Sequence, residues 1–272
     1  MAIIIKHACV VNEGQRGPQD IKIVGKRIVQ IATDITAKVN DQVIDANGLL
    51  LLPGMIDDQV HFREPGLTHK GTIASESAAA VAGGITSYME MPNVSPATTN
   101  IETLQAKFDI AARHSLANYS FYLGATHDNL EQIKRLDSSQ VCGVKVFMGA
   151  STGNLLVEDP HCLESIFRES PVLIATHCED NQTIQQQQRQ LREQLSPELW
   201  QPHHHPLLRD DQACYRSSSL AVGLAKRYHS QLHVLHTTSA KELALFEPGP
   251  IDNKQITAEA CVHHLWFSDR DY

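Results

Sequence analysis

The order of apolar and polar positions divides the chain into a short β-rich segment and a longer segment in which strands alternate with helices. Before residue 50 the apolar runs are short, and the turn-forming pairs Gly25-Lys26 and Asn47-Gly48 separate them. This pattern predicts a small β module over residues 1–50. Its expected strands are Ile3–Val11, Ile21–Val24, Arg27–Ile31 and Val43–Ile44.

Apolar β-rich runs alternate with helix-period segments from residue 51 onward, a pattern typical of a parallel sheet covered by helices. The expected strands are Leu50–Phe62, Ile85–Met91, Tyr119–Gly124, Gly143–Met148, Val172–His177, Leu232–His236 and Ile256–Val262. The expected helices are Ala74–Ala82, Ile101–Arg113, Leu130–Leu136, Pro160–Arg168 and Asp210–Tyr228. Seven such units favour an α/β fold, a TIM-like β/α barrel over residues 51–272 that lacks its last strand. A doubly wound open sheet is the alternative.

Composition and charge exclude several classes of protein. The 272 residues are 42% hydrophobic and carry a net charge of −8 without a stripe of lysine and arginine, which argues against a nucleic-acid-binding surface. Six scattered cysteines without a CxxC pair favour reduced thiols. The first residues lack the features of a signal peptide, and no apolar run approaches about 18 residues, so we expect a cytoplasmic protein without a membrane segment.

Histidines recur at the ends of three predicted strands: His61, His177 and His236. The carboxyl ends of barrel strands converge, and neutral imidazole is the commonest protein ligand of zinc. Any one of these histidines alone would more often be a core residue with satisfied hydrogen bonds, but their shared position predicts a metal site. Gln59 and Arg63 alternate with His61 and are expected to point the same way.

Lys145 lies within an apolar predicted strand, where an unpaired ammonium group would be costly to bury. A lysine desolvated in this way is readily neutral and nucleophilic, so it can add carbon dioxide and become a carbamate that bridges two metal ions. The competing interpretation is a lysine whose stem packs while its head reaches water or pairs with a carboxylate. The strand pattern by itself slightly favours the competing interpretation.

Two segments of biased composition are assigned no function. The glutamine-rich segment Gln182–Gln190 is predicted to be a solvated helix or loop. The triplet His203-His204-His205 has the composition of a metal cluster, but we expect a solvated, proline-flanked loop, because adjacent side chains of an extended segment point apart.

Six stretches of the sequence, in order between residues 53 and 267, resemble the dihydroorotase family of the amidohydrolase superfamily. They are PGMIDDQVHFREPG, TSYMEMPN, GVKVFMGASTGNLLV, ATHCED, HVLHTTSAKEL and ITAEACVHHLWF, and HFREPG together with MPN is quite specific. The resemblance implies a barrel of the metal-dependent hydrolase type that uses zinc. It also implies the reversible hydrolysis of dihydroorotate to N-carbamoyl-L-aspartate in pyrimidine biosynthesis.

The metal-binding residues of the family can be carried over position by position. They fall on Gln59 and His61 of the first strand, on the bridging carboxylated lysine at Lys145, and on His177 and His236. The resemblance therefore implies one or two zinc ions and a CO2-derived carbamate on Lys145. The chemistry agrees, because hydrolysis of a cyclic amide needs a metal that polarises the carbonyl and lowers the pKa of bound water toward about 7.

The residues that bind the substrate carboxylate in the family fall on Arg63 and Asn93. Arginine offers a planar pair of donors to a carboxylate, and asparagine adds an amide donor. The competing interpretation of Arg63 is a surface ion pair with Glu64. Hydantoinases, dihydropyrimidinases and allantoinases would share the metal residues without needing Arg63 and Asn93 for a substrate carboxylate, so these two residues distinguish the candidates.

The sequence departs from the family at two places. Gln59 replaces a histidine by a weak neutral ligand, so one metal position should be weakened. The chain stops at Tyr272, before the eighth strand whose aspartate binds metal and transfers the proton in the family. We therefore expect a truncated polypeptide with negligible activity on its own. His263 and His264 could substitute for that aspartate, but we expect at most one of them to face the site.

A non-catalytic interpretation belongs to a different class. A dihydroorotase-like chain that has lost the metal-binding histidine at Gln59 and the terminal aspartate could serve as a scaffold for a partner such as aspartate transcarbamoylase. Metal content discriminates the two, because a scaffold need not bind zinc. A small-molecule substrate and a homodimer are compatible with the sequence, and neither nucleic acid nor membrane is expected as a partner.

Overall fold

The structure is a computed structural model that describes residues 1–151 and 153–271. Thr152, which falls within the stretch GVKVFMGASTGNLLV, and Tyr272, the last residue, lie outside the described residues. The chain separates into two compact units, Met1–Met55 and Ile56–Tyr272. No helix of the described residues combines the length and apolarity needed to cross a membrane.

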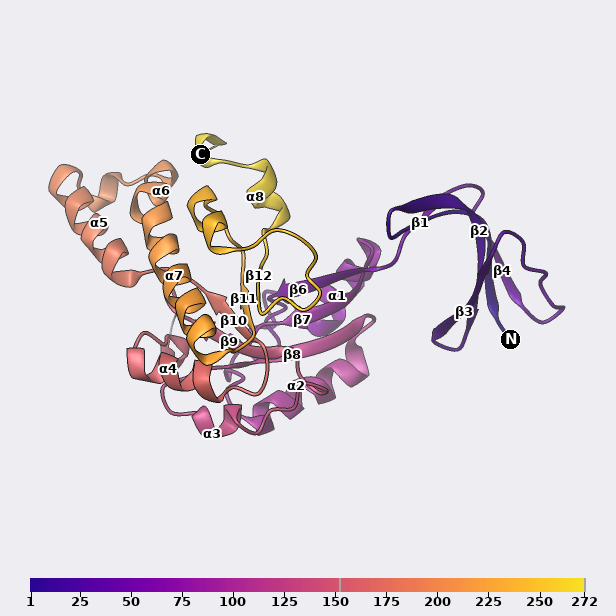
Figure 1. Ribbon diagram of the computed structural model, residues 1–272, viewed down its shortest axis with the longest axis horizontal. Coiled ribbons are helices and arrows are strands. Elements are labelled where there is room, and N and C mark those ends of the chain that lie inside the picture. The colour runs from indigo at the N-terminus through magenta and orange to yellow at the C-terminus, as the bar shows by residue number, and fades with distance from the viewer. Residues whose placement is uncertain (152, 272) are drawn as a thin grey trace. The chain divides into compact units, whose positions relative to one another are not determined.

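The first unit is a five-stranded sheet. Its strands are β1 (Ile3–Asn12), β2 (Gln15–Val24), β3 (Arg27–Ala32), β4 (Gln42–Asp45) and β5 (Leu50–Leu51), of which Figure 1 labels the first four. The order is β3-β2-β1-β4, with β5 also pairing with β1. The β1–β2 and β2–β3 pairs are antiparallel hairpins, whereas β4 and β5 run parallel to β1.

A buried carboxylate holds the bulge in β1. The register of β1 on β2 shifts between Ile5 and Ala8, and His7 in the bulge has a left-handed φ of 57°. Asp20 pairs with Lys6 at 2.7 Å and accepts the N–H groups of His7 and Ile35. These interactions, the Lys6 contact first, lower the pKa of Asp20 to about 2, so the carboxylate stays charged and keeps the bulge in place.

The second unit is built around a seven-stranded sheet. Its strands are β6 (Met55–Val60), β7 (Ile85–Glu90), β8 (Asn118–Gly124), β9 (Gly143–Phe147), β10 (Ile174–His177), β11 (Leu232–Val234) and β12 (Ile256–Ala258). Its helices are α1 (Ile73–Ala82), α2 (Ile101–His114), α3 (Leu130–Ile133), α4 (Pro160–Glu169), α5 (Asn181–Gln194), α6 (His205–Leu208), α7 (Asp211–Tyr228) and α8 (Val262–Trp266). The elements therefore alternate along the chain as predicted.

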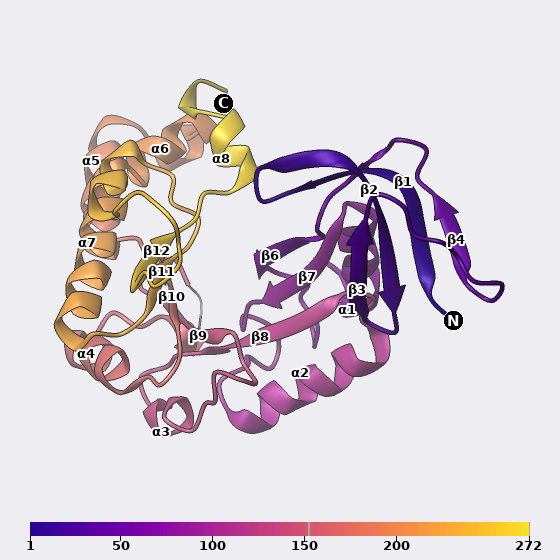
Figure 2. The same ribbon diagram turned by 45° about the vertical axis from the view of Figure 1, so that its right-hand side comes forward.

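The strand order selects a barrel-type sheet. It runs β12-β11-β10-β9-β8-β7-β6, in sequence order without a reversal, and every pair from β7 to β12 is parallel. A doubly wound sheet reverses its order at a switch point, so that alternative does not describe this chain. Figure 2 shows the sheet curling, with α2, α3, α4 and α7 along its convex side. The unit is thus a curled, half-barrel arrangement of β/α units.

Alternation along the strands places apolar and functional side chains on opposite faces. On β9, Val144 and Val146 are fully buried in the layer shared with the helices, and Lys145 between them points to the other face. On β10, Ile174 belongs to the same helix-side core, whereas Ala175 packs in a smaller cluster with Leu235. The helix-side core therefore fixes which residues reach the concave face.

The expected strand Leu50–Phe62 is wrong as a single element. Leu50–Leu51 forms β5 on the sheet of the first unit, and a separate strand, β6, begins at Met55. Pro53 and Gly54 lie between the two, and proline cannot donate to a ladder hydrogen bond. His61 consequently lies one residue beyond the end of β6.

The two segments of biased composition are helical. The glutamine-rich segment lies inside α5, where Asp180 accepts the N–H of Thr183 as the N-cap and Ile184 is buried. The histidine triplet is not the expected extended loop: Pro202–His204 is a 3₁₀ helix and His205 begins α6. Proline suits the first position of a helix because its missing N–H would have no partner there.

Candidate metal and substrate site

His61 is neutral and engaged on both ring nitrogens. Its Nδ1 lies 2.8 Å from Oδ1 of Asn93, which can only accept, so Nδ1 carries the proton. Its Nε2 lies 3.0 Å from Nε2 of Gln59, whose amide group donates to the remaining lone pair. Burial, together with the nearby charge of Arg63, lowers the pKa of His61 to about 4. Gln59 therefore occupies the lone pair that His61 would offer to a metal.

His177 and His236 face one another across the ends of β10 and β11. Nδ1 of His177 lies 3.2 Å from Nε2 of His236. His177 donates from Nε2 to Glu179 at 2.8 Å, so its Nδ1 keeps a lone pair, which is the acceptor toward Nε2 of His236. Two nitrogen ligands about 2.0 Å from a tetrahedral zinc lie about 3.3 Å apart, so this pair has the separation that zinc requires.

The backbone and burial of His236 also suit a metal ligand. Its N–H donates to Oε1 of Glu259 at 2.9 Å, and its φ is 41°. Burial, and then the charge of Lys145, lower the pKa of His236 to about 3, so the imidazole is neutral at physiological pH. A neutral imidazole is the form that binds a metal.

Lys145 is buried, with only 1% of its surface exposed to solvent. Its Nζ lies 4.6 Å from the centre of the Phe147 ring, and among the described residues no carboxylate forms an ion pair with it. Burial lowers its pKa to about 7, because the ammonium form loses its hydration. The snorkelling or ion-paired lysine of the competing interpretation does not describe this side chain.

Some of the predicted metal-binding residues line a cavity of about 420 Å³. Gln59, His177 and His236 line it. Lys145 and His61 are not in its lining, but the charge of Lys145 acts on the pKa of both His61 and His236. The donor set of two converging imidazoles beside a buried lysine fits zinc, whereas the Gln59 side of the site fits it poorly.

Arg63 and Asn93, the predicted substrate-binding residues, lie against one another. Arg63 donates from Nη1 to the carbonyl oxygen of Asn93 at 3.3 Å. The ion pair between Arg63 and Glu64 considered in the competing interpretation is not formed, because Glu64 accepts the N–H of Ile73 at 2.7 Å, at the start of α1. The other guanidinium donors of Arg63 have no carboxylate partner among the described residues.

The sequence analysis did not predict a buried ion pair that contacts the backbone of Arg63. Lys107 of α2 and Glu90 of β7 are both fully buried and paired, and Lys107 also donates to the carbonyl oxygen of Met91 at 3.0 Å. Oε1 of Glu90 accepts the N–H of Arg63 at 3.2 Å, and Arg63 has a left-handed φ of 73°. No sequence spacing connects Lys107 to Glu90, because the contact depends on how α2 packs on the sheet.

Glu179 and Arg209 are further residues that the sequence analysis missed. Oε2 of Glu179 accepts from His177 and, at 2.5 Å, from Nη1 of Arg209. A carboxylate that accepts from a metal-binding imidazole fixes its ring orientation. Glu179 stands two residues after His177 in ATHCED, and that spacing was the available signal; Arg209 had none.

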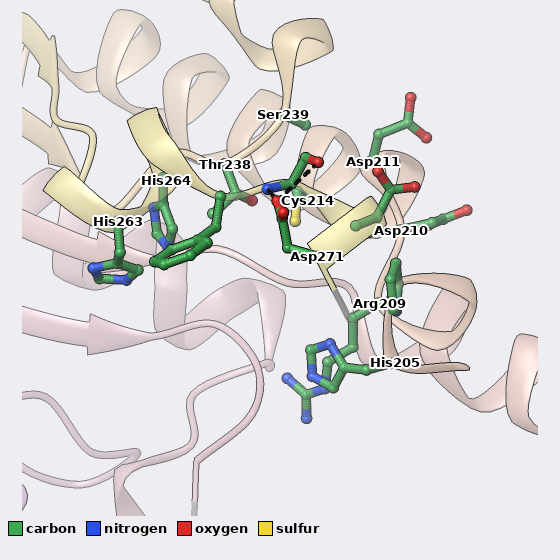
Figure 3. Close-up of a pocket in the computed structure, with 14 residues that line it drawn as sticks. His205, Arg209, Asp210, Asp211, Cys214, Thr238, Ser239, His263, His264 and Asp271 are labelled. Carbon is green, nitrogen blue, oxygen red and sulfur yellow. Dashed lines mark hydrogen bonds between the residues drawn. The ribbon is translucent and has the colours of Figure 1, made fainter. Parts of the chain in front are cut away.

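A larger pocket of about 890 Å³ adjoins the 420 Å³ cavity. The two share lining residues, namely His205, Arg209, Cys214, Thr238, His263 and His264. Figure 3 shows His263 and His264 together on the α8 side, and His205 beside Arg209. The expectation that at most one of His263 and His264 faces the site is wrong, because both lie on helix α8, where successive residues are about 100° apart instead of opposite.

Comparison with known proteins gives consistent matches. Residues 48–148 match a family model described as dihydro-orotase-like. A dihydroorotase of Methanosarcina mazei is 30% identical over 280 residues, covering 99% of this chain and 60% of that protein. An allantoinase of Deinococcus radiodurans is 30% identical over 276 residues, with the same coverage of 99% and 60%.

Solved structures agree on the fold. An L-hydantoinase (dihydropyrimidinase) from Arthrobacter aurescens superposes with a TM-score of 0.86 at 23% identity, over 95% of this chain and 58% of that one. A D-hydantoinase (dihydropyrimidinase) from Thermus sp. gives a TM-score of 0.83 at 22% identity. These likenesses confirm the predicted β/α barrel class. The chain spans about 60% of the length of the curated relatives it matches.

Proposed function

Because this chain belongs to the amidohydrolase superfamily, in its dihydroorotase-like group, we propose that it serves the reversible, zinc-dependent hydrolysis of dihydroorotate to N-carbamoyl-L-aspartate in pyrimidine biosynthesis. The observation that carries the proposal is the convergence of two imidazoles, His177 and His236, at 3.2 Å beside the buried Lys145. Such a donor set suits a metal-assisted attack of water on an amide.

The residues proposed to hold zinc are His177, His236 and a carbamate on Lys145, with His61 and Gln59 at a weaker second position. A bound zinc would polarise the amide carbonyl and lower the pKa of a water molecule. Glu179 holds the proton on Nε2 of His177, so that Nδ1 keeps its lone pair for the metal. The apolar surroundings of Lys145 favour its neutral amine, the form that adds carbon dioxide.

Arg63 and Asn93 support the choice of a substrate that carries a carboxylate. The guanidinium group of Arg63 keeps donors available beyond its single contact with the carbonyl oxygen of Asn93. The side-chain NH2 of Asn93 is also available, because only its Oδ1 is used by His61. Glu90 holds the Arg63 backbone, so the guanidinium starts from a fixed position.

An allantoinase-type function is the second candidate. A curated allantoinase is as similar to this chain, at 30% identity, as the first dihydroorotase. The metal-binding arrangement would serve either reaction. We favour dihydroorotate because Arg63 and Asn93 offer donors for its carboxylate, a group that allantoin lacks. Association with aspartate transcarbamoylase, or with a second copy of the chain, is a further proposal that awaits measurement.

Binding and turnover together test the proposal. Dihydroorotate, N-carbamoyl-L-aspartate, hydantoin and allantoin are titrated calorimetrically into the zinc-loaded chain, and both ring opening and ring closure are assayed. We expect dihydroorotate and N-carbamoyl-L-aspartate, which carry carboxylates, to bind more tightly than hydantoin and allantoin. Arg63→Met should weaken the binding of these two ligands by roughly 2–5 kcal/mol and affect hydantoin binding far less. Equal losses on charged and uncharged ligands would assign Arg63 a structural role. Preferential binding of allantoin would favour the second candidate.

A further inference from the structure

Three potential metal ligands that belong to neither His177 nor His236 meet in the second unit. Asp58 lies on β6, His233 lies on β11, and Glu259 follows β12 directly. Nε2 of His233 is 3.5 Å from Oδ2 of Asp58 and 3.5 Å from Oε2 of Glu259. One ligand atom from each residue lies within 4.8 Å of the others. The sequence motifs do not assign this cluster.

One ring nitrogen of His233 has a hydrogen-bond partner. Nδ1 lies 2.8 Å from Oγ1 of Thr257, and that hydroxyl can donate to the carbonyl oxygen of Leu232 while it accepts from Nδ1. With the proton on Nδ1, Nε2 carries a lone pair. That Nε2 atom is buried and has no hydrogen-bond partner among the described residues. An N–H donor on Nδ1 held by a neighbour is the usual arrangement of a metal-binding histidine.

Nε2 of His233 and the two carboxylate oxygens converge on one point, where either a proton or a metal ion would hold them together. Three donors about 2.1 Å from a tetrahedral metal ion lie about 3.4 Å apart, which agrees with the observed 3.5 Å separations. A direct hydrogen bond would bring the atoms to about 2.7–3.2 Å with good alignment. The two separations thus match those of ligands around an ion.

Glu259 is also held in place from its other side. Its Oε1 accepts the N–H of His236 at 2.9 Å, which leaves Oε2 to face His233. This bond fixes the carboxylate so that a metal would not have to order a mobile side chain, and it limits the entropic cost of binding. The same bond ties the cluster to the end of β11.

We propose that Asp58, His233 and Glu259 form a separate divalent-metal site that binds zinc through one imidazole and two carboxylates. One nitrogen and two carboxylate oxygens are an ordinary ligand set for Zn²⁺. The site uses side chains other than those of the proposed hydrolytic centre and touches that centre through the bond from the His236 N–H to Glu259. Its ion would neutralise the two carboxylates where β6 and β12 form the two ends of the sheet order.

Cobalt(II) and zinc titrations of the metal-free chain test the proposal. Cobalt binding is followed by its visible d–d absorption, and zinc binding by calorimetry. We expect the parent chain to bind one equivalent more than Asp58→Asn and one equivalent more than Glu259→Gln. Asp57→Asn is the matched control, because it removes the same charge one residue away and keeps an oxygen for the Gln59 N–H. It should bind as many equivalents as the parent.

Further variants separate this site from the proposed hydrolytic centre. His177→Asn should lose the equivalent that belongs to the hydrolytic centre and keep the one that Asp58→Asn loses. Circular dichroism establishes whether each variant folds. If Asp58→Asn does not fold, the comparison rests on Glu259→Gln. Equal stoichiometry in the parent, Asp58→Asn and Glu259→Gln would overturn the proposal. An equal loss in Asp57→Asn would also overturn it, because the effect would then be one of general charge.

Discussion

Gln59 directs its side-chain amide at Nε2 of His61, with 3.0 Å between the two nitrogens. Asn93 holds the opposite ring nitrogen of His61, so the imidazole is bound at both ends by neutral amides. In the family, a histidine stands where this chain has Gln59. The amide therefore stands where the resemblance implies a metal-binding histidine, and it covers the lone pair of its neighbour.

Replacing Gln59 by histidine should strengthen metal binding. Gln59→His supplies an imidazole and frees Nε2 of His61, so we expect the variant to retain more zinc per chain than the parent after dialysis against a mild chelator. Inductively coupled plasma mass spectrometry gives the zinc content. Gln59→Leu is the control, because it also frees His61 without adding a ligand. Zinc retention no higher than in the parent would show that this position does not reach the metal.

Removing the amine of Lys145 should remove the bridging ligand. We expect Lys145→Ala to lose tight binding of a second metal ion, and added short carboxylic acids to restore part of it by entering the space left behind. Intact mass measured under gentle conditions should show one added CO2 on the zinc-loaded parent and none on the variant. Unchanged metal binding in Lys145→Ala would mean that the carbamate has no role.

Glu179 should tune the affinity of the metal through His177. Glu179→Gln weakens the charge-assisted bond to Nε2 of His177, and the loss of such a partner typically lowers metal affinity about 10–100-fold. Competition with a colorimetric chelator measures the change. Glu158→Gln is the matched control, because Glu158 is an exposed glutamate that bonds Asn181 instead of a histidine. Similar affinities in the two variants would argue against the orienting role.

The buried pair of Lys107 and Glu90 should be strongly coupled. Lys107→Met leaves the Glu90 carboxylate buried without its partner, which should destabilise the second unit by about 3–5 kcal/mol. Adding Glu90→Gln should recover part of that loss. Urea unfolding followed by tryptophan fluorescence reports on this unit, since Trp200 and Trp266 both lie in it. An additive double variant would show that the two groups do not interact.

The local pattern of the sequence predicted most of the elements and several of the site residues. Expected helices such as Ile101–Arg113 agree with α2 to within one residue, because apolar periodicity and the N-cap Asn100 are local signals. His177, His236 and Lys145 were predicted as site residues on similar local signals, since alternation along a strand and position at its end can be read from neighbours. The break at Pro53-Gly54 was in the sequence too, but the apolar run on both sides concealed it.

Tertiary structure alone decided the contacts between distant segments. Glu90 meets Lys107 only because α2 packs on the sheet, and Asp58 meets His233 only because the sheet curls and brings β6 near β11. Such contacts depend on strand order and curvature, which local periodicity does not encode. The sequence by itself thus determined which side chains reach the concave face of the sheet. Folding decided which of them form hydrogen bonds and ion pairs with one another, because those interactions act over a few ångströms between residues far apart in the chain.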